Sequence, residues 1–179
     1  MLAGARTLRP DSGVDEMSMV FDGVIVAASP GRVEQALEQI RSHLDLTFQA
    51  VASGVLAVYP KGGRRQFDVE EDKRIAASLS ERLGRSLLVL WDDRIDCDQA
   101  YLYDNGHIAA EFGSADERYV PLDENGEPDI EGQRLTLEEL SGGEEYECIR
   151  HAIDAGLEAL GVGEQVSLRN LMEAFYKFD

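Results

Sequence analysis

The sequence predicts an α+β protein with a ferredoxin-like β-α-β-β-α-β core, extended by a β-hairpin and two C-terminal helices. Apolar, β-branched runs indicate strands, and between them lie stretches with apolar residues three and four positions apart, as in amphipathic helices. An Asn-Gly pair flanked by alternating residues predicts the hairpin. At 179 residues the chain has the length of one ordinary domain and can bury a core without disulfides or metals.

The first strand and the first helix are predicted between residues 20 and 44. The run VFDGVIVAAS at 20–29 is apolar and β-branched, which is typical of a strand. Ser29 and Pro30 are the residue types that favour a helix N-cap and the first helical position. The helix is expected to continue to Leu44, with one apolar face formed by Val33, Leu37, Ile40 and Leu44.

The middle of the core is expected to contain two short strands and a second helix. The strands lie within residues 47–60 and are joined by a tight turn at Ser53-Gly54. The helix begins at Asp68, where Glu71 completes a capping box, and it stops at Gly84.

A buried strand and a hairpin complete the first part of the chain. The run SLLVLW at 86–91 is continuously apolar, as in a strand inside a sheet. Residues 100–112 alternate around Asn105-Gly106, the strongest hairpin signal in the sequence.

The character of the sequence changes after Phe112. Residues 113–143 are acidic and rich in glycine, which predicts a connector with a small hairpin at Asn125-Gly126. A helix is expected from a capping box at Ser141 and Glu144 to Gly161, and a last helix is capped by Ser167. The predicted organisation is therefore a tail at 1–19, a core domain at 20–112, an acidic connector at 113–143, and C-terminal helices at 144–179 that pack on the core.

The charge is distributed very unevenly along the chain. The net charge is −18, yet residues 1–90 carry 11 Lys and Arg against 12 Asp and Glu, whereas residues 91–179 carry 6 against 23. A one-sided negative field attracts basic proteins and repels nucleic acid and anionic lipid. We therefore expect an acidic surface within residues 91–147. Its candidate partner-binding residues are Asp92, Asp93, Asp96, Asp98, Glu138, Glu139, Glu144 and Glu145.

The leading hypothesis is a non-enzymatic interaction or regulatory module that binds a basic protein partner. The sequence contains no Gly-x-Ser-x-Gly elbow and neither cysteine has a recognisable catalytic context, so a catalytic role has little support and no cofactor is expected. Neither nucleic acid nor a membrane is expected as a partner, and a homo-oligomer is left open. The two cysteines do not resemble the disulfide framework of a secreted protein, and the N-terminus lacks the apolar stretch of a secretory signal. Both observations predict a cytoplasmic location.

Two alternative sites remain open. The aspartates at 92, 93, 96 and 98 directly follow the buried strand, and hard oxygen ligands there suit Mg²⁺ or Ca²⁺ in a small metal-dependent enzyme. Lys61, Arg64 and Arg65 flank two glycines and could bind a small anion, although the pattern is no P-loop.

A zinc site is disfavoured by the spacing of its potential ligands. Cys148 and His151 are three residues apart on the predicted helix, but Cys97 and His107 fit no usual zinc-finger spacing. Buried cysteines and partly exposed histidines are the simpler interpretation.

Overall fold

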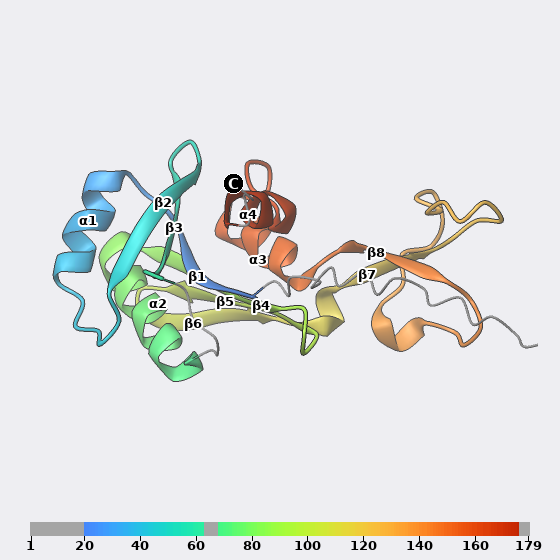
Figure 1. Ribbon diagram of the computed structural model, residues 1–179, viewed down its shortest axis with the longest axis horizontal. Helices are drawn as coiled ribbons and strands as arrows, with labels where there is room; N and C mark the ends of the chain where they lie inside the picture. The colour runs from blue at the N-terminus through green and yellow to red at the C-terminus, as the bar shows by residue number, and fades with distance from the viewer. Residues whose placement is uncertain (1–19, 63–67, 176–179) are drawn as a thin grey trace, which may run out of the picture.

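The computed structural model describes residues 20–62 and 68–175, which form a mixed α+β structure (Figure 1). A six-stranded, wholly antiparallel sheet has the strand order β2-β3-β1-β4-β5-β6, and a separate two-stranded sheet consists of β7 and β8. The strands are β1 (Val20–Ala27), β2 (Leu46–Ala52), β3 (Val55–Pro60), β4 (Arg85–Asp92), β5 (Cys97–Asp104), β6 (His107–Phe112), β7 (Arg118–Pro121) and β8 (Tyr146–Arg150). The four helices of the described residues are α1 (Pro30–Glu38), α2 (Val69–Leu83), α3 (Ala152–Leu160) and α4 (Leu168–Phe175).

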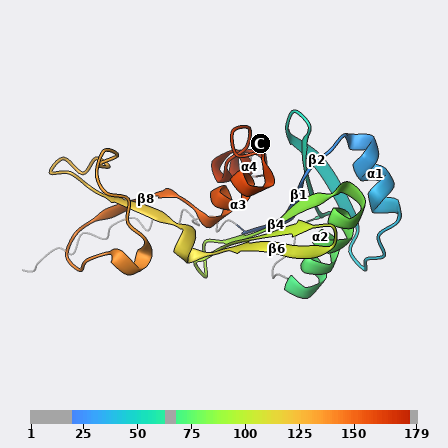
Figure 2. The ribbon, with the colours of Figure 1, turned by 180° about the vertical axis from the view of Figure 1, so that it is seen from behind.

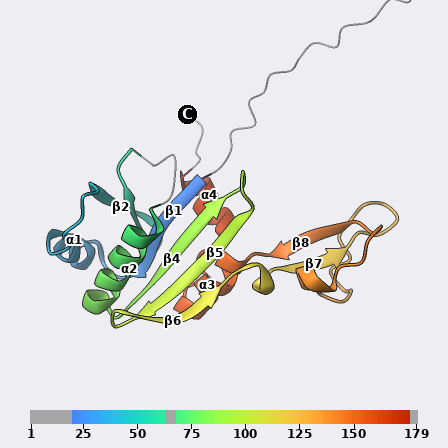
Figure 3. The same cartoon turned by 90° about the horizontal axis from the view of Figure 1, so that it is seen from below.

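Each face of the large sheet has its own hydrophobic core. On one face, Val24, Val26 and Leu88 pack with residues of α1 and α2. On the other face, Ile25 and Leu87 pack with residues of α3 and α4, because neighbouring residues of a strand point to opposite faces. Figure 3 shows α2 in front of the sheet and the two C-terminal helices behind it. The central strands β1, β3 and β4 are therefore buried on both sides, which explains their continuous apolar runs.

The predicted turns and caps of the core are largely confirmed. Strands β5 and β6 pair across Asn105 and Gly106, whose φ angles of 46° and 87° match a tight hairpin turn. The Asp68 carboxylate accepts a hydrogen bond from the Glu71 amide at 3.2 Å and so caps α2. The Glu71 side chain does not complete the predicted box, because it binds Arg74 and Ser42 instead.

The first helix is shorter than the sequence predicts. Helix α1 ends at Glu38, although its apolar spacing continues to Leu44. Ile40 and Leu44 still pack against the core, but they do so from the irregular segment that leads into β2.

The helix predicted from Ser141–Glu144 to Gly161 is wrong in its first part. Residues Tyr146–Arg150 form strand β8, and helix α3 begins only at Ala152. Strand β8 pairs with β7, which lies inside the segment expected to be a connector. The apolar spacing of Tyr146, Ile149 and Ile153 is that of a helix. The partner strand is distant in the sequence, so no neighbouring residue indicates a strand instead.

The β7–β8 sheet forms the base of a projecting arm, which we define as residues 118–150. Figures 1, 2 and 3 show the arm extending away from the six-stranded sheet and its four helices, which together form the body. Within the arm, the turn predicted at Asn125-Gly126 is present, with a backbone hydrogen bond from Gly126 to Asp123. The predicted tail at 1–19 lies outside the described residues. No helix in the described part of the chain is long and apolar enough to cross a membrane.

Candidate functional site

The arm carries a dense set of exposed carboxylates. All ten of its acidic residues are exposed, and it contains only three arginines, Arg118, Arg134 and Arg150. The ten acids are Asp123, Glu124, Glu127, Asp129, Glu131, Glu138, Glu139, Glu144, Glu145 and Glu147. The arm is therefore the most acidic projecting element that the structure describes.

The acidic residues of the arm differ from those of the body in how they are neutralised. On the body, some acids have a base partner, as in Asp45 with Lys61 at 3.3 Å and Asp104 with Arg85 at 3.7 Å, whereas exposed Glu34, Glu38 and Glu111 have no ion pair in the described residues. Within the described ranges, no ion pair involves any of the ten carboxylates of the arm. The Arg150 side chain turns to Glu158 of α3. The negative charge of the arm is thus available to a partner.

Some arm carboxylates also have local structural roles. Glu139 accepts hydrogen bonds from the amide and hydroxyl of Thr136, and Glu144 accepts from Ser141 and Tyr146. Glu138 and Glu145, the other two predicted binding residues on the arm, are exposed.

The arm has little core of its own and exposes apolar side chains. Val120 is its one fully buried hydrophobic residue among the described positions, whereas Ile130 is 68% exposed and Leu137 49% exposed. Single exposed apolar residues are normal on protein surfaces, so these two add only a small apolar area to the charged arm.

The four aspartates at 92, 93, 96 and 98 do not act as one set. Asp92 is buried and binds Arg94 through both carboxylate oxygens, at 2.8 and 2.6 Å. Asp93 and Asp96 are exposed, and Asp98 is buried on β5. Asp92 and Asp98 therefore do not belong to an exposed acidic surface.

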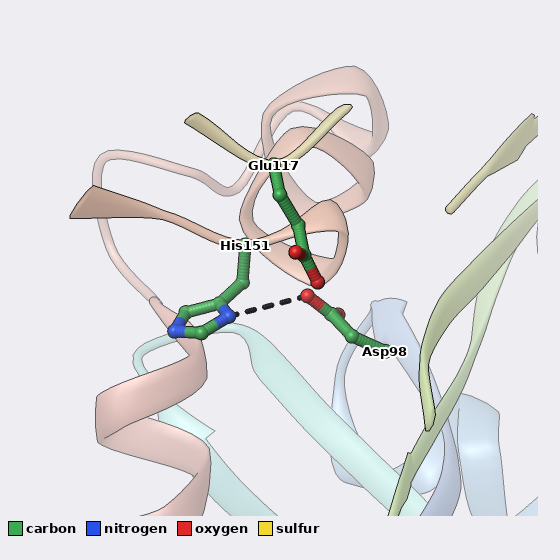
Figure 4. Close-up of side chains that lie close together, drawn as sticks. All are labelled: Asp98, Glu117 and His151. Atoms are coloured by element: carbon green, nitrogen blue, oxygen red, sulfur yellow. Dashed lines mark hydrogen bonds and ion pairs between the residues drawn. The ribbon is translucent and has the colours of Figure 1, made fainter. Parts of the chain in front are cut away.

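Asp98 is instead part of a cluster where the arm joins the body. Its carboxylate accepts hydrogen bonds from the first amides of α3, at 2.9 Å from Ala152 and 3.1 Å from Ile153. The same carboxylate lies 3.2 Å from Nδ1 of His151, the residue between β8 and α3. Glu117, just before β7, points at Asp98 from the other side (Figure 4). Among the described residues, only Asp98, Glu117 and His151 form a group of His, Cys, Asp or Glu with ligand atoms all within 4.8 Å.

In this root cluster, which consists of Asp98, Glu117 and His151, each residue shifts the pKa of a neighbour. Burial favours the neutral form of Asp98, but hydrogen bonds from His151, Glu117 and the two α3 amides hold its pKa below the usual value. Burial raises the pKa of Glu117, and the neighbouring Asp98 raises it further. The hydrogen bond to Asp98 raises the pKa of His151 to about 10. At neutral pH, His151 is therefore a cation beside an ionised Asp98.

Further side chains enclose the cluster on its other sides. The Tyr119 hydroxyl donates a hydrogen bond to Glu117, and the Trp91 ring lies edge-on to the His151 ring with centroids 5.3 Å apart. A pocket of about 220 Å³ opens on the three clustered side chains, and Asp92, Asp93 and Asp96 also line it. The cluster is thus reachable from solvent through a small opening.

The Cys148 thiol lies 3.9 Å from His151 Nδ1 but does not form a nucleophilic triad. In a triad, the nucleophile and the carboxylate contact different nitrogens of the histidine ring. Here the Cys148 sulfur and the Asp98 carboxylate both contact Nδ1. The arrangement therefore cannot relay a proton from the thiol through the ring.

The other predicted constellations are not assembled in the described residues. Cys97 donates to the Leu90 carbonyl and His107 begins β6, so neither joins Cys148 and His151. Lys61 pairs with Asp45, while Arg64 and Arg65 lie outside the described residues.

No family model matches this chain, and no curated protein or solved structure is significantly similar to it.

Sequence reasoning singled out Asp98 and His151 but placed them in different hypothetical sites, and it missed Glu117. Glu117 is one glutamate in an acidic stretch, with no motif to distinguish it. Only the pairing of β7 with β8 brings Glu117 and His151 to the same end of the arm. No local signal could have revealed that pairing.

Proposed function

We propose that this protein is a non-enzymatic interaction module that binds a basic protein partner through the acidic arm. The observation that carries the proposal is the set of ten exposed arm carboxylates without an ion pair in the described residues. A projecting element with unneutralised charge raises the rate of encounter with an oppositely charged partner and selects against acidic ones.

Two exposed apolar side chains on the arm offer contacts to a partner that its charge attracts. Of the four large hydrophobic side chains exposed in the described residues, Ile130 and Leu137 lie on the arm. Charge steers a complex together, whereas buried apolar anchors provide much of its lasting affinity. A basic partner with an apolar patch would satisfy both features.

The test compares two variants with the same loss of negative charge. The arm variant replaces Glu124, Glu131, Glu138 and Glu145 with glutamine, all of them exposed and without side-chain hydrogen bonds among those described. The control variant replaces Glu34, Glu38, Glu111 and Glu164, which are exposed on the body. The natural chain and each variant are immobilised and exposed to a cell extract at low salt. The proteins that each one retains are eluted with rising salt and identified.

A specific basic protein should be retained by the natural chain and by the control variant, and lost or eluted at much lower salt with the arm variant. Screening shortens the range of charge interactions to about 8 Å at physiological ionic strength, so elution should depend steeply on salt. Equal retention by both variants would contradict the proposal, because overall charge and not the arm would then explain binding.

We also propose that β1, α1, β2, β3, α2 and β4 form a ferredoxin-like unit that serves as the scaffold. The strand order β2-β3-β1-β4 and the packing of both helices on one face support this. The fold itself carries no function, so the activity is argued from the arm alone. Both cysteines are free thiols, which fits the reducing cytoplasm that we propose as the compartment.

The alternative of a metal-dependent enzyme built on the four aspartates has less support. Asp92 is already bound to Arg94, and the pKa of Asp92 is lowered chiefly by that hydrogen bond. An arginine so placed opposes a cation at the same carboxylate.

A further inference from the structure

We propose that Asp98, Glu117 and His151 form a binding site for one divalent transition-metal ion, with zinc as the ion that fits best. The three ligand atoms converge from separate segments, and two of the ligands flank the arm. The site differs from the four-aspartate cluster predicted from the sequence, with which it shares only Asp98.

The spacing of two of the three donors matches tetrahedral coordination, and the Glu117 donor lies within 4.8 Å of both. Zinc bonds to nitrogen and oxygen of about 2.0–2.1 Å place neighbouring ligands of a tetrahedron about 3.3 Å apart. His151 Nδ1 and Asp98 Oδ2 are 3.2 Å apart. An ion that displaces the Nδ1 proton of His151 can therefore take the position of the hydrogen between these two atoms with little movement of either side chain.

The hydrogen bonds of Asp98 leave room for the ion while fixing the carboxylate. Ile153 donates to Oδ1 and Ala152 donates to Oδ2, so each oxygen has a lone pair beyond its backbone bond. Backbone donors of this kind orient a metal-binding carboxylate as outer-shell partners do. Asp98 is therefore held in one orientation before any ion arrives.

Glu117 provides a reason for a cation at this point. It directs a second carboxylate at the buried Asp98, and two such groups at close range cannot both be ionised without a proton or a cation between them (Figure 4). In the metal-free cluster the His151 imidazolium beside Asp98 meets this need, and a bound ion would displace its proton and take over that role. Tyr119 donates to one oxygen of Glu117 and leaves the other for a ligand bond. The pocket that opens on the cluster gives an ion access and leaves a fourth coordination position towards solvent.

The donor set also restricts which ion the site would take. One imidazole with two carboxylates suits zinc and its first-row neighbours, whereas Mg²⁺ and Ca²⁺ prefer oxygen ligands alone. A bound ion would join β5 of the body to both ends of the arm, because Glu117 precedes β7 and His151 follows β8. The consequence would be an arm held at a fixed angle to the body.

The experiment titrates the full chain, first freed of metal with a chelator, with Co²⁺ as a spectroscopic substitute for Zn²⁺. We expect visible absorption bands that saturate at one equivalent and disappear when Zn²⁺ is added. Glu117→Gln and His151→Ala should each weaken binding at least about tenfold, since even outer-shell changes at metal sites have effects of that size. Thermal unfolding without metal shows whether each variant is folded.

Two controls separate this site from loose binding to the acidic surface. His107→Ala removes an exposed histidine on β6, and the arm variant with four glutamines removes arm charge; both should bind Co²⁺ as the natural chain does. Binding that never saturates at one equivalent, or that is unchanged in Glu117→Gln and His151→Ala, would overturn the proposal.

Discussion

At the scale of single residues, the environment of each carboxylate decides its role, and the sequence shows that environment only in part. Asp98 and Asp96 are two residues apart, yet Asp98 is buried against α3 and Asp96 is exposed in a turn with φ of 49°. The acidic run predicted a common surface. It could not show that the first amides of a helix more than fifty residues later require an acceptor at Asp98.

Glu71 provides a prediction at this scale. Its carboxylate is nearly buried and accepts two hydrogen bonds from Arg74, at 2.8 and 2.6 Å, and one from Ser42. The hydrogen bond from Arg74 is the main reason why the pKa of Glu71 falls from 4.5 to about 2. Glu71→Gln should lower the free energy of unfolding at pH 7 by about 1.5–3 kcal/mol, the range for hydrogen bonds to charged groups.

The pH dependence of that loss follows from the lowered pKa. A carboxylate with a lowered pKa in the folded state stabilises the protein above its unfolded pKa and loses this effect as the pH falls through the folded value. The stability difference between the natural chain and Glu71→Gln should therefore be constant above about pH 5 and shrink towards pH 2. Denaturant unfolding at several pH values measures it. The exposed neighbour variant Glu70→Gln should show a far smaller difference, and an equal, pH-independent loss in both would contradict the account.

At the scale of elements, the sequence predicted what depends on neighbouring residues. The turn at Asn105-Gly106, the cap at Asp68 and the stop at Gly84 are all local features, and the structure contains each of them. Strand β8 was missed because its partner β7 is separated from it in the sequence by the rest of the arm. Pairing between segments so far apart in the sequence leaves no local pattern. The cap predicted at Ser167 for the last helix is confirmed, because the Ser167 hydroxyl accepts a hydrogen bond from the Asn170 amide at 3.3 Å.

The arm should open more readily than the body. Two-stranded ribbons are marginally stable alone, and the arm buries only Val120 fully among its hydrophobic residues. The central strands β1 and β4 are paired on both sides and covered by helices on both faces. Backbone amides of β7 and β8 should therefore exchange with solvent deuterium much faster than those of β1 and β4.

Hydrogen exchange followed by mass spectrometry on peptides from each region measures this difference. Protection of the arm equal to that of β1 and β4 would mean that the arm has stabilising contacts beyond those described. A rise in arm protection on adding one equivalent of Zn²⁺ would further agree with an ion that joins both ends of the arm to β5.

At the scale of the whole molecule, the sequence predicted a charge imbalance but not its shape. The second half of the chain carries most of the acid, as counting alone reveals. The structure divides that acid among three environments: part is paired or buried in the body, as with Asp92 and Asp98, a smaller part such as Glu111 and Glu164 is exposed on the body, and the larger exposed share lies on a projecting arm. Counting cannot make this division, because it depends on which carboxylates meet an arginine or a helix end in three dimensions.

The central claim is that available negative charge is concentrated on residues 118–150. The most direct test is to add a short lysine-rich peptide to the isotope-labelled chain at low salt and follow backbone amide shifts by NMR. We predict that the shifts concentrate on the arm, weaken as salt is added, and largely vanish when Glu124, Glu131, Glu138 and Glu145 are replaced with glutamine. Shifts of similar size over the helices and sheet of the body, unchanged in that variant, would contradict the account.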